Sequence, residues 1–127
     1  MIAPADIREY EAQARSTDMV GRVLCSARNH HFIIDGPVQN GFSGEEMTPA
    51  EMFLSGVASC GVELVQMLAK QQEIPLQGIS NSIKGIIDRG NPVRPDFTVF
   101  NTVRLEFHLQ GVTEEQGTQL IEAFKRR

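Results

Sequence analysis

The chain has 127 residues, a length that fits a single domain with a buried core over residues 1–127. Hydrophobic residues make up 41% and charged residues 22%, and the net charge of −4 argues against nucleic acid or an anionic membrane as a partner. Glu63 interrupts the most apolar segment, so we expect no membrane span. Two cysteines and the lack of an apolar N-terminal segment predict a reduced, cytoplasmic protein.

The first 17 residues have no single secondary-structure pattern. Ile7, Tyr10 and Ala14 recur at helical spacing after Pro4, which favours a short helix. An arm that docks onto the rest of the chain is an equally good interpretation. Both alternatives stay open from the sequence.

Two strands are predicted next. Residues 19–26 alternate weakly, with Met19, Val23 and Cys25 on one face and Arg22 on the other. A turn-prone break follows this first strand, and His30–Asp35 forms the second one, which closes at a Gly-Pro pair. Strands so close in sequence predict an antiparallel hairpin.

The longest predicted element is a helix over residues 48–71, around which the rest of the chain is expected to pack. A loop with three glycines, residues 36–47, leads into it. Thr48 serves as N-cap, Pro49 takes the first helical position, and Glu51 completes a capping box. Apart from a narrow stripe of polar residues, the helix carries apolar or small residues around its whole circumference. This pattern is typical of a core helix that is covered on several sides.

A second hairpin and a final helix complete the chain. Residues 79–88 and 97–109 both alternate, and a turn with two prolines lies between them. The second of these segments has one apolar and one polar face, as in a sheet with one buried side. Thr113 and Gln116 form a capping box for a helix that runs to the end of the chain. The predicted class is α+β, with an antiparallel sheet packed on the long central helix.

Cys60 is the first candidate for chemistry, because it lies near the middle of the long helix. The residues around it, 58–61, are small and would let a substrate or another backbone come close. Cysteine is also among the most buried residue types, so a packing role is the favoured interpretation from residue type alone. Cys60 lies too far into the helix for the N-terminal dipole to stabilise a thiolate, and the nearby carboxylate of Glu63 would disfavour one.

The remaining candidates are weak. Cys25 is interpreted as a strand residue, and a disulfide between Cys25 and Cys60 has little support. His30 and His31 are adjacent in a strand and therefore point to opposite faces, and His108 lies on the polar face of its strand. We therefore expect no metal site and no cofactor.

Three segments in order resemble the OsmC/Ohr family of osmotically induced and organic-hydroperoxide-resistance proteins. They are the glycine-rich approach, then TPAEMFLSGVASC, then IPLQGISNSIKGIID. Pro49 and Cys60 have the spacing of the family's helix-opening proline and its cysteine, and Pro75 begins the Pro-Leu-x-Gly turn that typically follows. The resemblance covers most of residues 19–127.

The resemblance implies a fold, an assembly and a chemistry. Family members form intertwined homodimers with the long helices buried against each other. In their reaction a peroxidatic cysteine, here Cys60, attacks an organic hydroperoxide, a resolving cysteine closes a disulfide, and a dithiol reduces it. An arginine holds the thiolate, and Arg22 is the candidate here. The family places a glutamate after the helix-opening proline to orient that arginine, whereas this chain has Ala50, and the resolving cysteine would follow Arg127.

Two functional hypotheses follow. The first is a thiol-dependent reduction of organic hydroperoxides in the oxidative stress response, with Cys60 and Arg22 as the catalytic residues and a dithiol as the reductant. The second is a non-catalytic relative that binds a small apolar ligand or a protein partner at the dimer interface. In both hypotheses the chain's first partner is a second copy of itself.

Overall fold

The computed structural model describes residues 6–127, which form two compact units. The first unit reaches to Met52, and the second runs from Phe53 to Arg127, so the boundary falls in the first turn of the long helix. Each unit is described here by itself. The single-domain assignment stays a prediction, and the part of the N-terminal prediction that involves residues 1–5 lies outside the described residues.

The first unit is built on a three-stranded antiparallel sheet in the order β1-β2-β3. Its strands are β1 (Gln13–Ser16), β2 (Arg22–Ala27) and β3 (His30–Asp35). The predicted hairpin is confirmed, because β2 and β3 pair directly across a two-residue turn. Arg28 and Asn29 in that turn have φ angles of 48° and 71°, the left-handed values that a tight hairpin turn requires.

Two predictions for this unit need correction. Of the two alternatives for the N-terminal segment, the helix is wrong within residues 6–17, where Gln13–Ser16 pairs with β2 as an edge strand and thus docks on the sheet. The next strand begins at Arg22 rather than Met19, because the Arg22 N–H donates to the Met19 carbonyl at 3.0 Å and closes a turn. Gly21 in that turn has a φ of 91°, which ends the extended conformation.

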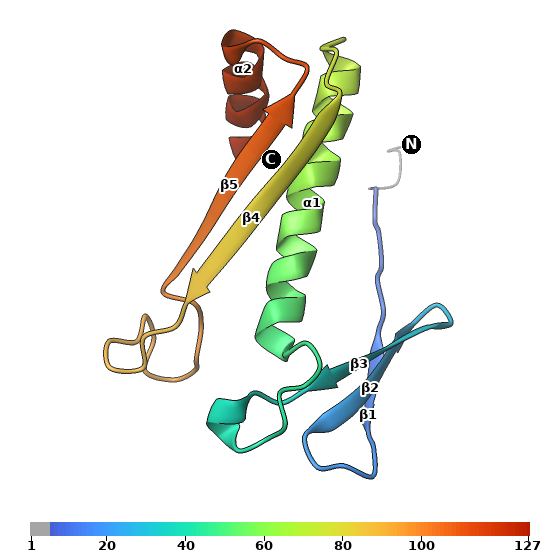
Figure 1. Ribbon diagram of the computed structural model, residues 1–127, viewed down its shortest axis with the longest axis vertical. Coiled ribbons are helices and arrows are strands. Elements are labelled where there is room, and N and C mark those ends of the chain that lie inside the picture. The colour runs from blue at the N-terminus through green and yellow to red at the C-terminus, as the bar shows by residue number, and fades with distance from the viewer. Residues whose placement is uncertain (1–5) are drawn as a thin grey trace, which may run out of the picture. The chain divides into compact units, whose positions relative to one another are not determined.

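The second unit contains a long helix, a hairpin and a shorter helix. They are α1 (Pro49–Gln71), β4 (Gly78–Ile86), β5 (Thr102–Gln110) and α2 (Glu114–Lys125), and α1 and α2 both lie against the β4–β5 hairpin (Figure 1). Both predicted capping boxes are present. The Glu51 N–H donates to Thr48 Oγ1 at 3.3 Å, and the Gln116 N–H donates to Thr113 Oγ1 at 3.1 Å.

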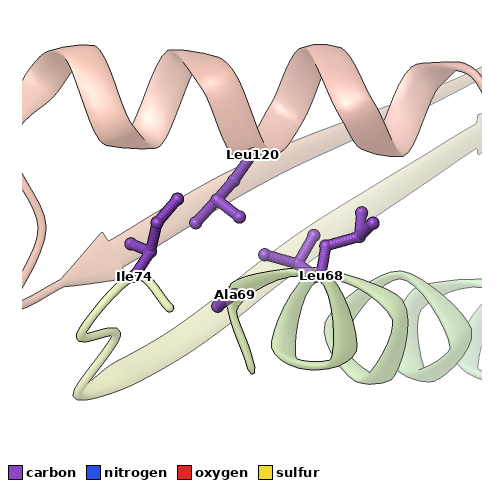
Figure 2. Packing of buried hydrophobic residues seen from close by; sticks show 5 residues of the cluster. Leu68, Ala69, Ile74 and Leu120 are labelled. Carbon is purple, nitrogen blue, oxygen red and sulfur yellow. The ribbon is translucent and has the colours of Figure 1, made fainter. Parts of the chain in front are cut away.

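The core of the second unit lies where both helices meet the hairpin. Leu120 from α2 points toward Leu68 and Ile74 (Figure 2), and Leu120 and Val65 are fully buried. On the sheet side, the Phe107 ring packs edge-on against Phe124, with 5.2 Å between ring centroids. Apolar side chains that alternate along β4 and β5 thus cover the C-terminal half of α1 and one face of α2.

Within this chain, α1 is buried along one face only. Its buried residues are Gly61, Val65, Leu68 and Ala69. The expectation that the helix is covered on several sides therefore does not hold for the single chain. By length and composition alone α1 could cross a membrane despite Glu63, although the core helix of a soluble protein passes the same test.

The strand predicted over residues 97–109 begins later, at Thr102. Asn101 explains the difference, because it uses its backbone and side chain to close the preceding loop. Its N–H donates to the Ile86 carbonyl at 2.7 Å, its Oδ1 accepts from the Asp88 N–H at 2.7 Å, and its Nδ2 donates to the Asn91 carbonyl at 2.8 Å. These bonds also end β4 at Ile86, two residues before the predicted end.

Candidate functional site

Cys60 lies on the exposed side of α1, and its thiol is free. The neighbouring Gly61 is buried against the hairpin, where a Cβ would meet the Phe107 ring at 3.0 Å and the Asn81 amide nitrogen at 3.3 Å. Asn81 also donates from Nδ2 to the Ala58 carbonyl at 2.9 Å. Because successive residues of a helix point about 100° apart, this contact on Gly61 directs Cys60 toward the surface. Cys60 is therefore not buried in the core of the single chain, and a packing role between two copies stays a prediction.

The surface around Cys60 is made of small and apolar residues. Gly56, one turn before the thiol, leaves open space where a side chain would be, and a Cβ there would meet nothing within 4 Å. Phe53, two turns before Cys60, is 58% exposed, and its ring stacks on Phe100 at a centroid distance of 5.9 Å. The N-terminal half of α1 therefore presents an accessible, largely apolar face with one nucleophile. We call residues 53, 56 and 60 the thiol face.

Arg22, the second predicted site residue, begins β2 in the first unit and pairs with Asp35, the last residue of β3. The pair is bidentate, with Arg22 Nε donating to Asp35 Oδ1 and Nη2 donating to Oδ2, both at 2.7 Å. The Asp35 side chain is 1% exposed and that of Arg22 is 25% exposed. A fork of two charge-assisted bonds fixes the plane of the guanidinium as well as its position.

Asp35 is held by more donors than Arg22 alone. Its Oδ2 accepts from Ser43 Oγ at 2.8 Å, from the Glu45 N–H at 3.1 Å and from the Glu46 N–H at 2.9 Å. The hydrogen bonds from Arg22 are the main cause that lowers the pKa of Asp35 far below its usual value, and those from Glu46 and Ser43 add to it. The same pair raises the pKa of Arg22 above its usual value. Both groups are therefore charged throughout the neutral range.

An aromatic ring packs beside this ion pair. The Phe42 ring lies against Gly21 and Gly36, the residues directly next to Arg22 and Asp35 in sequence. Gly36 also donates its N–H to the Gly21 carbonyl at 2.8 Å, so the two glycines continue the hairpin beneath the ring. A side chain at either glycine would occupy the space of the ring, because a Cβ at Gly21 or at Gly36 would clash with Phe42.

Sequence reasoning missed Asp35, although a signal for it was present. Once a two-residue turn is placed at Arg28 and Asn29, the predicted hairpin pairs residue 22 with residue 35, opposite charges on facing positions. The role of Glu51 as a capping residue was predicted correctly. The hydrogen bonds from Thr48 lower the pKa of Glu51.

The remaining sequence predictions for sites concern cysteines and metals. Cys25 lies in β2 opposite Phe32, is half-buried, and is free like Cys60. Among residues 6–127, no group of three or more histidine, cysteine or acidic side chains could hold a metal ion. Arg22 and Cys60 belong to different units.

Comparison with known proteins identifies the family. The family described as OsmC-like protein matches residues 42–127, about two thirds of the chain. This chain belongs to the OsmC-like family. The match begins in the glycine-rich loop and includes all of α1 and the second unit.

Solved structures have the same fold as this OsmC-like chain. An OsmC-like protein from Mycoplasma pneumoniae aligns with a TM-score of 0.79 and 16% identity over 94% of this chain and 82% of its own. An organic hydroperoxide resistance protein from Elizabethkingia anophelis aligns with a TM-score of 0.78 and 18% identity, over 97% of this chain and 85% of the Elizabethkingia protein. An organic hydroperoxide resistance protein named OsmC, from Legionella pneumophila, aligns with a TM-score of 0.75 and 17% identity. The alignment covers 94% of this chain and 84% of the Legionella protein. No curated protein matches the chain.

Proposed function

We propose that this OsmC-like chain reduces organic hydroperoxides with the thiol of Cys60. The observation that carries the proposal is the exposure of Cys60 on the thiol face, where a substrate can reach the sulfur. Structural relatives from Elizabethkingia anophelis and Legionella pneumophila are named organic hydroperoxide resistance proteins, which supports the same chemistry here.

The reaction begins with attack of the Cys60 thiolate on one oxygen of the peroxide. A sulfur–oxygen bond forms as the oxygen–oxygen bond breaks, and the departing alkoxide takes a proton and leaves as an alcohol. The cysteine is thereby oxidised to a sulfenic acid while the hydroperoxide is reduced. A dithiol then attacks the sulfenic sulfur and releases water. Its second thiol displaces the Cys60 thiolate, and the dithiol leaves as a disulfide.

We assign to Arg22 the role of stabilising the thiolate and the charge that develops on the departing oxygen. A guanidinium is always protonated and presents several donors, which suits an anionic sulfur or oxygen. The raised pKa of Arg22 supports a permanent positive charge at this position.

The thiol face supports a second proposal, that the chain works as a homodimer. Phe53 and Gly56 leave an apolar surface on a helix that is buried on one side only, and a second copy would cover these two residues while the Cys60 thiol stays open to substrate. The alternative function, a non-catalytic protein that binds an apolar ligand or a protein partner, rests on the same exposed surface.

For the assembly, we expect the wild-type protein to sediment as a dimer at micromolar concentration. Gly56→Phe places a ring in space that is open in the single chain, so it should weaken a dimer without disturbing the fold. Gly56→Ala is the matched control and should remain dimeric. A wild-type protein that is monomeric at this concentration contradicts the homodimer.

For the chemistry, we expect Cys60→Ser to abolish consumption of an organic hydroperoxide such as cumene hydroperoxide with dithiothreitol as reductant. Because Cys60 is exposed, the melting temperature of the Cys60→Ser variant should differ little from that of the wild type. Cys25→Ser, the matched control, should retain turnover. Turnover that persists in Cys60→Ser removes the thiol mechanism, and no turnover in the wild type favours the non-catalytic alternative.

A further inference from the structure

We infer that Asn81 is a positioning residue for Cys60, because its side chain holds the turn of α1 that carries the thiol. The inference rests on the proposed function, to which it adds a residue that orients the nucleophile without touching the substrate. Asn81, Ala58, Cys60 and Gly61 all belong to the second unit.

Asn81 is the polar exception on the face of β4 that is turned toward α1. From Ile79 to Ile86 the side chains alternate, and those on the face of Asn81 are half-buried, whereas those on the opposite face are exposed. The other residues on the half-buried face are Ile79, Ile83 and Gly85. An amide loses hydrogen bonds to water at such a position, which costs free energy unless a protein group replaces the water. An apolar side chain would avoid this cost, so packing alone does not account for the amide.

The amide of Asn81 bonds to a carbonyl in the middle of the long helix. Its Nδ2 donates to the Ala58 carbonyl at 2.9 Å. In an α-helix this carbonyl also accepts the N–H of the residue four positions on, here Val62. Ala58 lies in the interior of α1, so its carbonyl is not one of the unpaired groups of a helix end. The bond therefore satisfies Asn81 and gives the helix an additional, directional link to the hairpin.

Asn81 reaches α1 on both sides of Cys60. Ala58 comes two residues before the thiol and Gly61 directly after it, and a Cβ at Gly61 would meet Asn81 Nδ2 at 3.3 Å and the Phe107 ring at 3.0 Å. Apolar contact between a glycine and a ring resists closer approach but has no preferred direction. A hydrogen bond weakens steeply with angle, so the bond from Asn81 limits both rotation and sliding of α1 at this turn.

The turn around Cys60 depends on such a link. Gly56 and Gly61 lie on either side of the thiol, and glycine lowers the stability of a helix relative to alanine. Attack on a peroxide requires the sulfur to approach along the oxygen–oxygen bond, and a small misplacement of a reacting group lowers the rate. A bond that fixes this turn therefore favours attack by Cys60.

A hydrogen bond that serves stability alone has the same geometry, so the variants must separate the two roles. Asn81→Leu removes the donor and keeps a side chain of similar size. Because Ala58 retains its helical hydrogen bond, no buried polar group loses its partner, and the free energy of unfolding should stay the same or rise. Asn81→Ala is a second variant without the bond, for the case that leucine displaces its neighbours. Ile83→Leu is the matched control, since it changes a side chain on the same face of β4 without removing a hydrogen bond.

We would measure turnover of cumene hydroperoxide with dithiothreitol, and alkylation of Cys60 by iodoacetamide, all in a Cys25→Ser background. If Asn81 positions Cys60, both Asn81 variants should lower kcat about 10-fold or more with a smaller change in KM. The rate of alkylation should stay close to that of the wild type, because a small reagent reaches an exposed thiol in many orientations. Ile83→Leu should turn over like the wild type.

A second readout follows the bond itself. The carbon-13 shift of the Ala58 carbonyl should differ between the wild type and Asn81→Leu, because the carbonyl loses one of its two donors. Near-UV circular dichroism confirms that each variant is folded. Wild-type kcat in the folded Asn81 variants, or an unchanged Ala58 carbonyl shift, overturns the inference. A wild type without turnover refutes the proposed function, whereas a wild type that turns over no faster than the Asn81 variants refutes only the positioning role.

Discussion

Leu120→Ala is expected to lower the free energy of unfolding by about 2–5 kcal/mol, the range for removing a fully buried leucine side chain. Leu120 is 0% exposed and joins α2 to the core formed with Leu68 and Ile74. The loss of stability has two causes. The removed atoms no longer contribute the free energy of burying apolar surface away from water, and the surrounding side chains relax only partly into the cavity that is left. In a chain of this size such a loss is a large fraction of the total stability.

Urea denaturation followed by far-UV circular dichroism measures this effect, because the chain has no tryptophan for fluorescence. Val93→Ala serves as the control. Val93 is an aliphatic residue that is 57% exposed, so its truncation should change the free energy of unfolding by less than about 0.5 kcal/mol. Equal midpoints for the two variants would show that α2 does not contribute to the core as described.

Gly36→Ala is expected to destabilise the first unit, although it adds a single methyl group. The new Cβ would clash with Phe42 Cδ2, so the ring must leave its place between Gly36 and Gly21. Overpacking of this kind typically costs about 1–3 kcal/mol. Because Phe42 is followed directly by Ser43, which donates to Asp35, we also expect the Glu45 and Glu46 amides to exchange hydrogen faster in this variant.

A second substitution makes the steric cause testable. Gly36→Ala combined with Phe42→Leu removes the ring atom that would clash, so the double variant should recover part of the stability and the slow amide exchange. Gly56→Ala is the control for adding a methyl group at a glycine, and it should be neutral or slightly stabilising because its Cβ meets nothing. Gly36→Ala with wild-type stability and exchange would contradict the packing described for Phe42.

Local signals in the sequence predicted much of the fold. The Thr48–Glu51 and Thr113–Gln116 capping boxes gave the starts of both helices, because their hydrogen bonds depend only on residues three apart. The limits of β3, His30–Asp35, were predicted to the residue. The family resemblance rested on the helix-opening proline and Cys60, and the match to the OsmC-like family confirms it.

The errors came from interactions that residue type and spacing do not encode. Alternation in residues 97–101 favours a strand, but Asn101 uses its backbone and side chain to fold that segment into a loop. Met19 fits the alternation of the following strand, yet the left-handed Gly21 places it in a turn. The exposure of Cys60 depends on Gly61 meeting Phe107, residues that are far apart in the sequence.

The close packing at Gly61 has a consequence for how this chain can change over evolutionary time. The direction of the reactive sulfur is decided by a residue without a side chain, since any Cβ at position 61 would press on Phe107 and Asn81. One residue inserted between Cys60 and Gly61 would turn the cysteine by about a further 100° around the helix, relative to the side that packs on the hairpin. Point substitutions on the outer side of α1, such as at Gly56, leave that direction intact. The outer surface of α1 can therefore change by substitution, whereas a larger residue at position 61 would alter the packing that sets the direction of the Cys60 side chain.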